Sequence, residues 1–241
     1  MTPHFFVSPA DIGDGTAVLS ETDSRHLTTV LRARSGDALT ISDGEGTVWS
    51  ARHAGVAGGL VTVALDTATV IPLRHPQLTV VHALPKQRKL DEVIQRLTEL
   101  DVAKIVPVHS QRSQVELDER KAAKVVARWR VIAEAAAKQS KRARLPEITD
   151  VGNWSDAFPA GADGVVCWEE STVPLRNVLG DATAPQSFVL GIGPEGGLTP
   201  AEVVATGLPD ASLGATILRS ETAALVAVSA IAYHYGLMEP R

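Results

Sequence analysis

Two short stretches near the C-terminus combine glycine, carboxylate and arginine residues in a spacing that could support chemistry. The first, F-V-L-G-I-G-P-E-G-G-L-T-P at 188–200, places Glu195 in a glycine-rich loop after an apolar run. Glycines at such a position let backbone amides approach a ligand closely. The second, L-G-A-T-I-L-R-S-E-T-A-A at 213–224, carries Arg219 and Glu221. Both stretches are therefore candidates for a ligand-binding site with acid–base groups beside it.

Each stretch is expected to run from a strand into a helix. The apolar run 188–192 is long enough for a buried strand, and a second strand is predicted at the start of the stretch 213–224. Thr199 and Glu202 have the spacing of a capping box, and Pro200 stands at the first helical position, where a missing N–H costs nothing. Ser220 or Thr222 would cap the second helix.

The first loop also satisfies the dinucleotide fingerprint G-x-G-x-x-G through Gly191, Gly193 and Gly196. That fingerprint should open a long series of strands and helices, yet only 44 residues follow Gly197. A nicotinamide-dependent oxidoreductase is therefore disfavoured. Taken alone, the loop is equally compatible with a plain glycine-rich turn between a strand and a helix.

The two stretches together are more specific, because G-P-E-G-G and L-G-x-x-I-L-R-x-E-T-A resemble the signature of the RsmE family. These SPOUT methyltransferases modify N3 of a uridine in the 16S rRNA of the small ribosomal subunit. The resemblance implies an α/β domain with a trefoil knot, a homodimer, no metal, and S-adenosylmethionine held between the two loops. The implied cofactor-binding residues are Leu190, Gly191, Ile192, Gly193, Pro194, Glu195, Gly196, Leu213, Gly214, Leu218, Arg219 and Thr222.

Catalytic roles are expected for Glu195, Arg219 and Glu221. Methyl transfer requires the uridine imide to lose its proton and the reactants to be held in line, and positioning supplies much of the rate. Either glutamate could act in acid–base chemistry, or could instead anchor the methionine amino group or a backbone turn. Arg219 could orient a phosphate or the uracil carbonyls. Thr216 stands where this family usually has an arginine.

Residues 1–73 are predicted to form a small β-barrel with one short helix. A helix is expected at 24–33, and strands at 38–42, 47–53 and 60–70, separated by glycine-rich turns. His26-Leu27 and Val30-Leu31-Arg32 resemble the PUA-like RNA-binding domain of the same family, which makes His26 and Arg32 candidate RNA contacts. A local capping or pairing role is at least as plausible for both. His4 stands near the start, where the family usually carries an arginine.

Two prolines at 72 and 76 mark a linker, so a second domain is expected at 74–241. Within it, a strand at 78–84, an amphipathic helix from Leu90 to Leu100 and a strand at 102–108 predict a mostly parallel sheet.

The longest predicted helix, 118–141, is strongly basic at its end. Residues 119–144 hold nine basic and two acidic residues, although the whole chain has a net charge of −5. A local basic face can bind phosphate whatever the overall charge. A solvated helix face, or cations that complement the helix C-terminus, are the alternatives. The family segment E-A-x-x-Q-S-x-R favours RNA contact by Lys138, Lys141, Arg142 and Arg144.

The remaining sequence features suggest an ordinary globular protein. The 241 residues, 44% of them hydrophobic, hold no apolar run as long as a membrane span and no signal-like N-terminus, so a cytoplasmic protein is expected. Cys167 is the only cysteine and is expected to be a buried apolar residue rather than a catalytic thiol. The apolar helix predicted at 223–235 is expected to be buried against a second subunit.

Three functions are consistent with these features. The first is a uridine-N3 methyltransferase acting on 16S rRNA, either free or in the assembled small subunit. The second is a related SPOUT enzyme that modifies another base or a ribose, against which the PUA-like segment weighs. The third is an RNA-binding protein without catalysis, which would not need to retain both C-terminal motifs.

Overall fold

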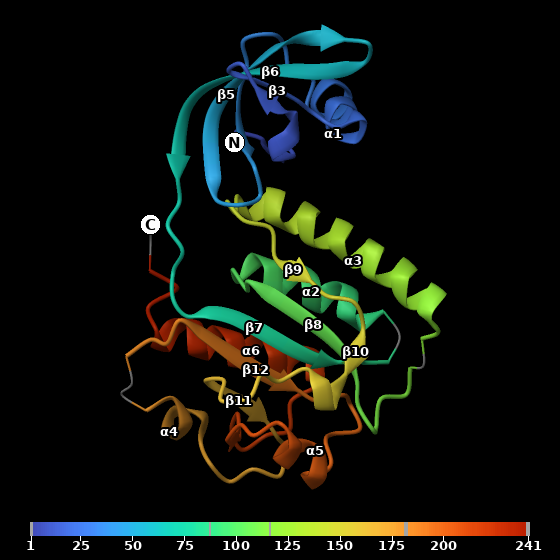
Figure 1. Ribbon diagram of the computed structural model, residues 1–241, viewed down its shortest axis with the longest axis vertical. Helices are drawn as coiled ribbons and strands as arrows, with labels where there is room; N and C mark the ends of the chain where they lie inside the picture. Colours follow the sequence, from blue (N-terminus) through green and yellow to red (C-terminus); the bar gives the residue numbers. More distant parts are fainter. Residues whose placement is uncertain (1, 87, 116, 181–182, 240–241) are drawn as a thin grey trace. The chain divides into compact units, whose positions relative to one another are not determined.

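The computed structural model describes residues 2–239 except 87, 116, 181 and 182. The chain forms two compact units (Figure 1). The first unit contains Met1–Leu73 together with Glu134–Leu145, and the second contains Arg74–Ala133 with Pro146–Arg241. The expected break near residue 73 coincides with one division between the units, but residues 134–145 return to the N-terminal unit. No helix among the described residues is both long and apolar enough to cross a membrane.

The first unit is built on a six-stranded sheet with the order β1-β4-β5-β6-β3-β2. All its pairings are antiparallel except that of β1 with β4. Leu19, Leu27, Ile41 and Val61 are among the buried residues of its core. The strands are β1 (His4–Phe6), β2 (Ile12–Gly13), β3 (Thr16–Val18), β4 (Ala38–Ser42), β5 (Thr47–Ala57) and β6 (Leu60–Val70).

The helix predicted at 24–33 starts earlier and changes its winding. Helix α1 (Glu21–Arg25) begins after Ser20, whose hydroxyl accepts a hydrogen bond from the backbone N–H of Asp23 at 3.1 Å. A π-helical turn (His26–Val30) follows it. The apolar spacing at 27, 30 and 31 pointed to the second part only, because the first turn is set by its cap rather than by apolar periodicity.

The second unit holds a parallel sheet with the order β10-β8-β7-β12-β11-β13, and β9 pairs with β8. This confirms the expected parallel α/β arrangement. The strands are β7 (Gln77–Ala83), β8 (Lys104–His109), β9 (Glu147–Ile148), β10 (Gly152–Asn153), β11 (Gly164–Cys167), β12 (Ser187–Ile192) and β13 (Asp210–Ala211). The helices are α2 (Lys89–Glu99), α3 (Glu119–Ser140), α4 (Leu175–Leu179), α5 (Pro200–Ala205) and α6 (Ser220–His234).

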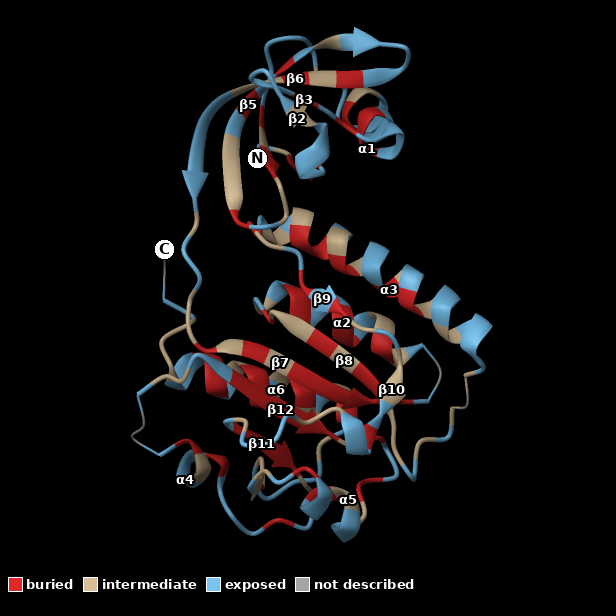
Figure 2. Ribbon diagram, viewed as in Figure 1, coloured by how far each residue is buried: buried red, intermediate tan, exposed pale blue. Residues whose placement is uncertain are grey.

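Both faces of this sheet are covered, so its central strands are buried (Figure 2). Leu78 and Val80 of β7 share a core with apolar residues of α2 and α6, whereas Val81 faces a second core that includes Val203 of α5. Alternate residues of one strand thus point into opposite layers. The long helix α3 contributes Trp129 to the first of these cores, and its part from Glu134 onwards belongs to the first unit.

The two C-terminal stretches differ in how well local rules predicted them. The capping box is confirmed, because Thr199 Oγ1 accepts from the N–H of Glu202 and the Glu202 carboxylate accepts from the N–H of Thr199. The strand predicted at the start of 213–224 is wrong: β13 is two residues long and ends at Ala211, and the residues up to α6 form a loop. Gly214 adopts a φ of +133°, which no ordinary strand residue adopts. Ser220 and Thr222 do not cap α6, whose N-cap is Arg219.

Candidate active site

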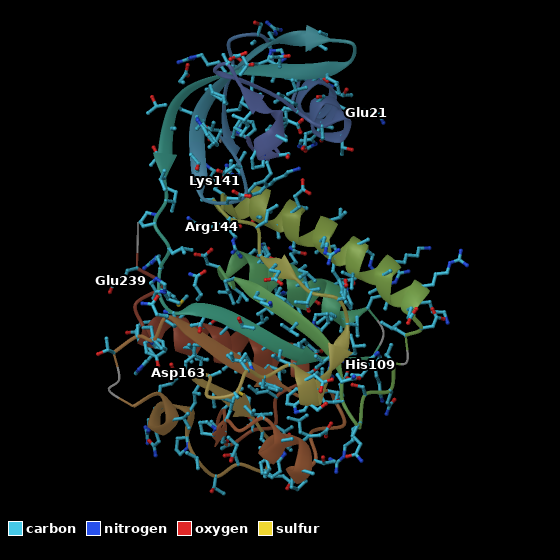
Figure 3. All side chains as sticks on the ribbon, in the orientation of Figure 1. Glu21, His109, Lys141, Arg144, Asp163 and Glu239 are labelled. Atoms are coloured by element: carbon cyan, nitrogen blue, oxygen red, sulfur yellow. The ribbon has the colours of Figure 1, made fainter. Side chains whose placement is uncertain are left out.

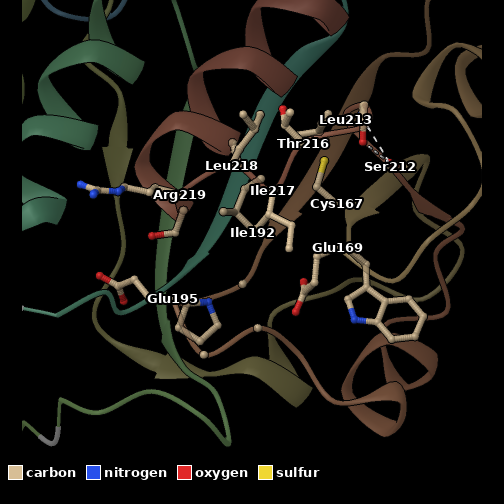
Figure 4. Close-up of a pocket in the computed structure, with 18 of the residues that line it drawn as sticks. Cys167, Glu169, Ile192, Glu195, Ser212, Leu213, Thr216, Ile217, Leu218 and Arg219 are labelled. Carbon is tan, nitrogen blue, oxygen red and sulfur yellow. Dashed lines mark hydrogen bonds between the residues drawn. The ribbon is translucent and has the colours of Figure 1, made fainter.

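Three loops of the second unit line a cavity of about 440 Å³ (Figure 4). They are 167–169, which follows β11, 192–197, which follows β12, and 212–220, which leads into α6, together with Ala223. Parallel pairing places Cys167 beside Ile192, so the carboxyl ends of β11 and β12 open on the same edge of the sheet. Ligands of open parallel sheets bind at this edge.

Nine of the twelve predicted cofactor residues lie in the cavity wall: Ile192, Gly193, Pro194, Glu195, Gly196, Leu213, Gly214, Leu218 and Arg219. Leu190 and Gly191 are instead buried within β12, and Thr222 lies in the first turn of α6. The structure therefore brings the two predicted stretches together around one cavity.

The loop 167–169 was missed by sequence reasoning. It carries no motif, and Cys167 was interpreted only as a buried apolar residue. That part is consistent with the structure, because burial raises the pKa of the Cys167 thiol to about 12 and keeps it protonated. The available signal was the change from the apolar run 164–167 to Glu169 and Glu170, which is typical of the carboxyl end of a buried strand.

Two glycines of the first loop pack closely against other parts of the protein. A Cβ at Gly196 would lie 3.1 Å from Cβ of Arg112. Gly197 has a φ of +72°, and a Cβ there would lie 1.8 Å from a carboxylate oxygen of Glu169. The tight packing of this loop against two other segments thus explains these glycines without a ligand, so a bulky substitution at Gly196 would disturb the loop whether or not a cofactor touches it.

The cavity wall combines apolar and acidic groups. Its apolar part includes Ile192, Leu213, Ile217 and Leu218, and Ile217 is 86% exposed although it is a large aliphatic residue. Glu169 and Glu195 supply carboxylates at the wall. A cavity whose wall combines apolar side chains with a few charged groups suits an adenosine group and a cationic sulfonium.

Glu195 and Glu221 are joined by one lysine. Lys89 Nζ lies 3.0 Å from Glu195 Oε1 and 3.4 Å from Glu221 Oε1. Glu195 also accepts hydrogen bonds from the backbone N–H of Lys86 at 3.1 and 3.2 Å. Partial burial raises the pKa of both carboxyls, but the hydrogen bonds from Lys89 and from backbone N–H groups outweigh it and hold each pKa below its ordinary value. Both glutamates are therefore ionised and are weak proton acceptors.

Arg219 is placed differently from these two glutamates. Its side chain is exposed and points away from the apolar wall of the cavity (Figure 4). A guanidinium at this position could meet negative charge that develops on a bound substrate.

Three of the four cations predicted to contact RNA at the end of α3 have contacts within the first unit. Lys138 Nζ lies 2.7 Å from Asp23 Oδ1 and 2.7 Å from Glu134 Oε1. Arg144 Nη1 donates to the backbone carbonyl of Ile71 at 2.7 Å, and Arg142 is buried. Lys141 is exposed; Figure 3 labels it with Arg144. Their role in RNA binding stays a prediction, and Lys141 is the one of these four cations that is exposed.

Two other predicted RNA contacts remain accessible in the first unit. His26 and Arg32 are exposed. His4, by contrast, is buried in β1, and burial lowers its pKa, with Lys141 and Lys138 adding to the effect, so it does not replace the family arginine as a surface cation.

Comparisons with known proteins agree with this geometry. The RNA methyltransferase domain family matches residues 73–232, and the RNA methyltransferase PUA domain family matches residues 19–66. The chain is 33% identical to ribosomal RNA small subunit methyltransferase E of Mycobacterium bovis, over 94% of this chain and 90% of that one. It is also 33% identical to the protein of the same name from Bacillus subtilis, with 88% of each chain covered.

Solved structures show the same fold. The crystal structure of a ribosomal RNA small subunit methyltransferase E from Neisseria gonorrhoeae, bound to S-adenosyl methionine, superposes with a TM-score of 0.84 at 29% identity, covering 96% of this chain and 97% of that one. A putative methyltransferase from Legionella pneumophila, also with bound cofactor, gives a TM-score of 0.80 at 27% identity, with 97% and 98% covered. With a cavity at its two C-terminal motifs and these relatives over nearly its whole length, the chain belongs to the ribosomal RNA small subunit methyltransferase E family.

Proposed function

We propose that this protein transfers a methyl group from S-adenosylmethionine to N3 of a uridine in 16S rRNA of the small ribosomal subunit. The observation that carries the proposal is the cavity in which the G-P-E-G-G loop and the L-R-S-E-T segment meet at the carboxyl edge of the parallel sheet. Two solved structures with the same fold hold the cofactor, and the names of the Neisseria gonorrhoeae and Mycobacterium bovis relatives give ribosomal RNA as their substrate.

The residues of the cavity fit this cofactor. Leu213, Ile217 and Leu218 provide apolar surface for its adenosine, and Glu169 provides negative charge for its cationic groups. The cofactor would supply a methyl group activated by the positive charge of a sulfonium. The protein's part is to hold that methyl group in line with N3 and to exclude competing geometries.

The contacts of the three predicted catalytic residues assign them different parts. Glu195 and Glu221 are ionised and paired with Lys89, so they serve in the framework of the site rather than as the base. Arg219 is the group that can approach a substrate. When the uridine gives its imide proton to water, negative charge spreads to the two uracil carbonyl oxygens, and a nearby guanidinium stabilises it.

RNA contact and assembly are further parts of the proposal. His26, Arg32 and Lys141 are the exposed residues predicted to contact RNA in the first unit. The trefoil knot and the homodimer stay predictions of the family resemblance. The homodimer is supported by exposed apolar side chains on α6, where Val226 is 41% and Tyr233 is 78% exposed. Single apolar side chains at a surface are common, but neighbours on one helix suggest a partner.

The proposed reaction is tested by incubating the protein with S-adenosylmethionine and small ribosomal subunits, then digesting the 16S rRNA and identifying methylated nucleosides by mass spectrometry. 3-Methyluridine is expected with the parent protein and is expected to fall by about a hundredfold or more with Arg219→Ala. A different methylated base, or a 2′-O-methyl ribose, would indicate a related SPOUT activity instead. Tight RNA binding without any methylation would favour the RNA-binding protein.

The homodimer is tested by light scattering at micromolar protein. Tyr233→Glu places a charge on the exposed side of α6 and is expected to give a monomer with reduced methylation. A parent protein that is monomeric and fully active would contradict this part of the proposal.

A further inference from the structure

Lys89 occupies an electrostatically unfavourable position. It is the first residue of α2, and the preceding N-cap, Arg88, provides no side-chain hydrogen bond to the helix. The N-terminus of a helix carries partial positive charge, so two adjacent cations there are disfavoured. Asp91 and Glu92 in the first turn of α2 offset part of this charge, but the ion pairs of Lys89 are formed with carboxylates from outside the helix, those of Glu195 and Glu221.

The two carboxylates belong to different segments beside the cavity, and only Glu195 lies in its wall. Glu195 lies in the loop after β12, and Glu221 lies in the first turn of α6, directly after the loop 212–220. One ammonium group therefore joins the two cofactor loops to α2. The backbone N–H of Lys86 fixes Glu195 a second time, so the carboxylate has little freedom to turn toward the cavity.

The cluster lies at the end of β7, beside a buried histidine. His82 is fully buried, and burial lowers its pKa, although the backbone of Ala83 and Ser220 and the charges of Glu195 and Glu221 act in the opposite direction. A neutral imidazole cannot replace the positive charge of Lys89. Among the described residues, Lys89 is the charged group that forms an ion pair with both carboxylates, and the charge of Glu195 also acts on Glu221.

We propose that Lys89 is a positioning residue of the methyl-transfer site, which sets the separation of the two cofactor loops by bridging Glu195 and Glu221 from behind the cavity wall. This inference rests on the proposed placement of the cofactor between those loops. Without Lys89, the two ionised carboxylates would repel each other and the two loops would move apart. At a pH low enough to protonate one carboxyl, this repulsion would disappear. Loss of the lysine should therefore weaken cofactor binding in a pH-dependent way.

The experiment measures the dissociation constant of S-adenosylmethionine by calorimetry. Lys89→Met keeps an unbranched side chain one atom shorter and removes its charge, and Lys89→Arg keeps the charge. At about pH 8 the methionine variant is expected to bind about tenfold more weakly than the parent, a size usual for supporting residues around a bound ligand. Its affinity should recover toward about pH 5 as a carboxyl is protonated, while Lys89→Arg should stay within about threefold.

Two further variants separate positioning from a general loss of structure. Lys89→Met/Glu195→Gln removes the repulsion as well as the lysine and should bind more tightly than Lys89→Met alone. Arg96→Met is the matched control on the same helix, because Arg96 pairs with Glu92 at the exposed surface and should not affect the dissociation constant. Circular dichroism would check that every variant is folded.

The outcomes are distinct. Parent-like affinity of Lys89→Met at every pH would overturn the inference. So would an equal loss at every pH that neither arginine nor Glu195→Gln restores, because that pattern reflects only a structural role of the lysine. If Lys89→Met does not fold, the dissociation constants of Lys89→Arg and of Lys89→Met/Glu195→Gln, each compared with that of the parent protein, still test the inference. A cavity substitution such as Ile217→Ala that leaves cofactor binding unchanged would instead refute the placement of the cofactor.

Discussion

Ile217→Ala tests the cofactor site without disturbing the fold. Ile217 lines the cavity and is 86% exposed, so the protein itself gains little from this side chain. A change at such an exposed position should alter the free energy of unfolding by no more than about 0.5 kcal/mol. A ligand that fills the cavity would cover the side chain, and its apolar surface would then contribute to binding.

The magnitude follows from the three carbon atoms that the substitution removes. At about 0.8 kcal/mol for each buried CH₂ group, full coverage by the ligand corresponds to about 2.4 kcal/mol, which is about a 60-fold rise in the dissociation constant. Coverage of half the side chain corresponds to about 1.2 kcal/mol, or about eightfold. The expected rise therefore lies between these two values.

Calorimetric titration with S-adenosylmethionine measures this change, and thermal unfolding without ligand checks the fold. Val204→Ala is the matched control, because Val204 is a β-branched residue on α5 that is 79% exposed and lies outside the cavity wall. A folded Ile217→Ala protein whose dissociation constant is within about twofold of the parent value would refute the reasoning, because that change is well below the rise of about eightfold expected when the ligand covers half of the side chain.

Three further predictions concern charge and reactivity. Lys138→Ala should lower the free energy of unfolding, measured by urea denaturation, by about 1.5–3 kcal/mol, because the largely buried carboxylate of Asp23 loses its hydrogen bonds from a charged donor. Lys141→Ala should leave the free energy of unfolding unchanged and should instead reduce the salt dependence of RNA binding. The lowered pKa values of Glu195 and Glu221 stabilise the folded protein at pH values above their ordinary pKa of 4.5, and this stabilisation is lost as the pH falls through the lower pKa values of the folded state. Lys89→Met removes much of this stabilisation, so its midpoint of acid unfolding should lie closer to neutral pH than that of the parent protein. Cys167 should resist alkylation at about pH 8 in the native protein and react once it is unfolded in guanidinium, and rapid labelling of the native thiol would contradict its burial.

The sequence by itself determined the features that depend on neighbours along the chain. Strand β6 has the predicted bounds Leu60–Val70, and α3 lies within one residue of the expected helix at both ends, because apolar pattern and helix propensity act over a few residues. The capping box of α5 was likewise readable from Thr199, Pro200 and Glu202. The two motifs around the cavity were found because each is a contiguous stretch.

Tertiary structure decided which groups those stretches meet. Cys167 and Glu169 join the cavity because β11 pairs beside β12, and nothing near them in the sequence specifies that pairing. Lys138 and Lys141 belong to the same basic segment at the end of α3, yet Lys138 forms an ion pair with Asp23 while Lys141 is exposed. The charge state and the role of a side chain depend on burial and on partners more than a hundred residues away, and these are fixed only when the chain folds.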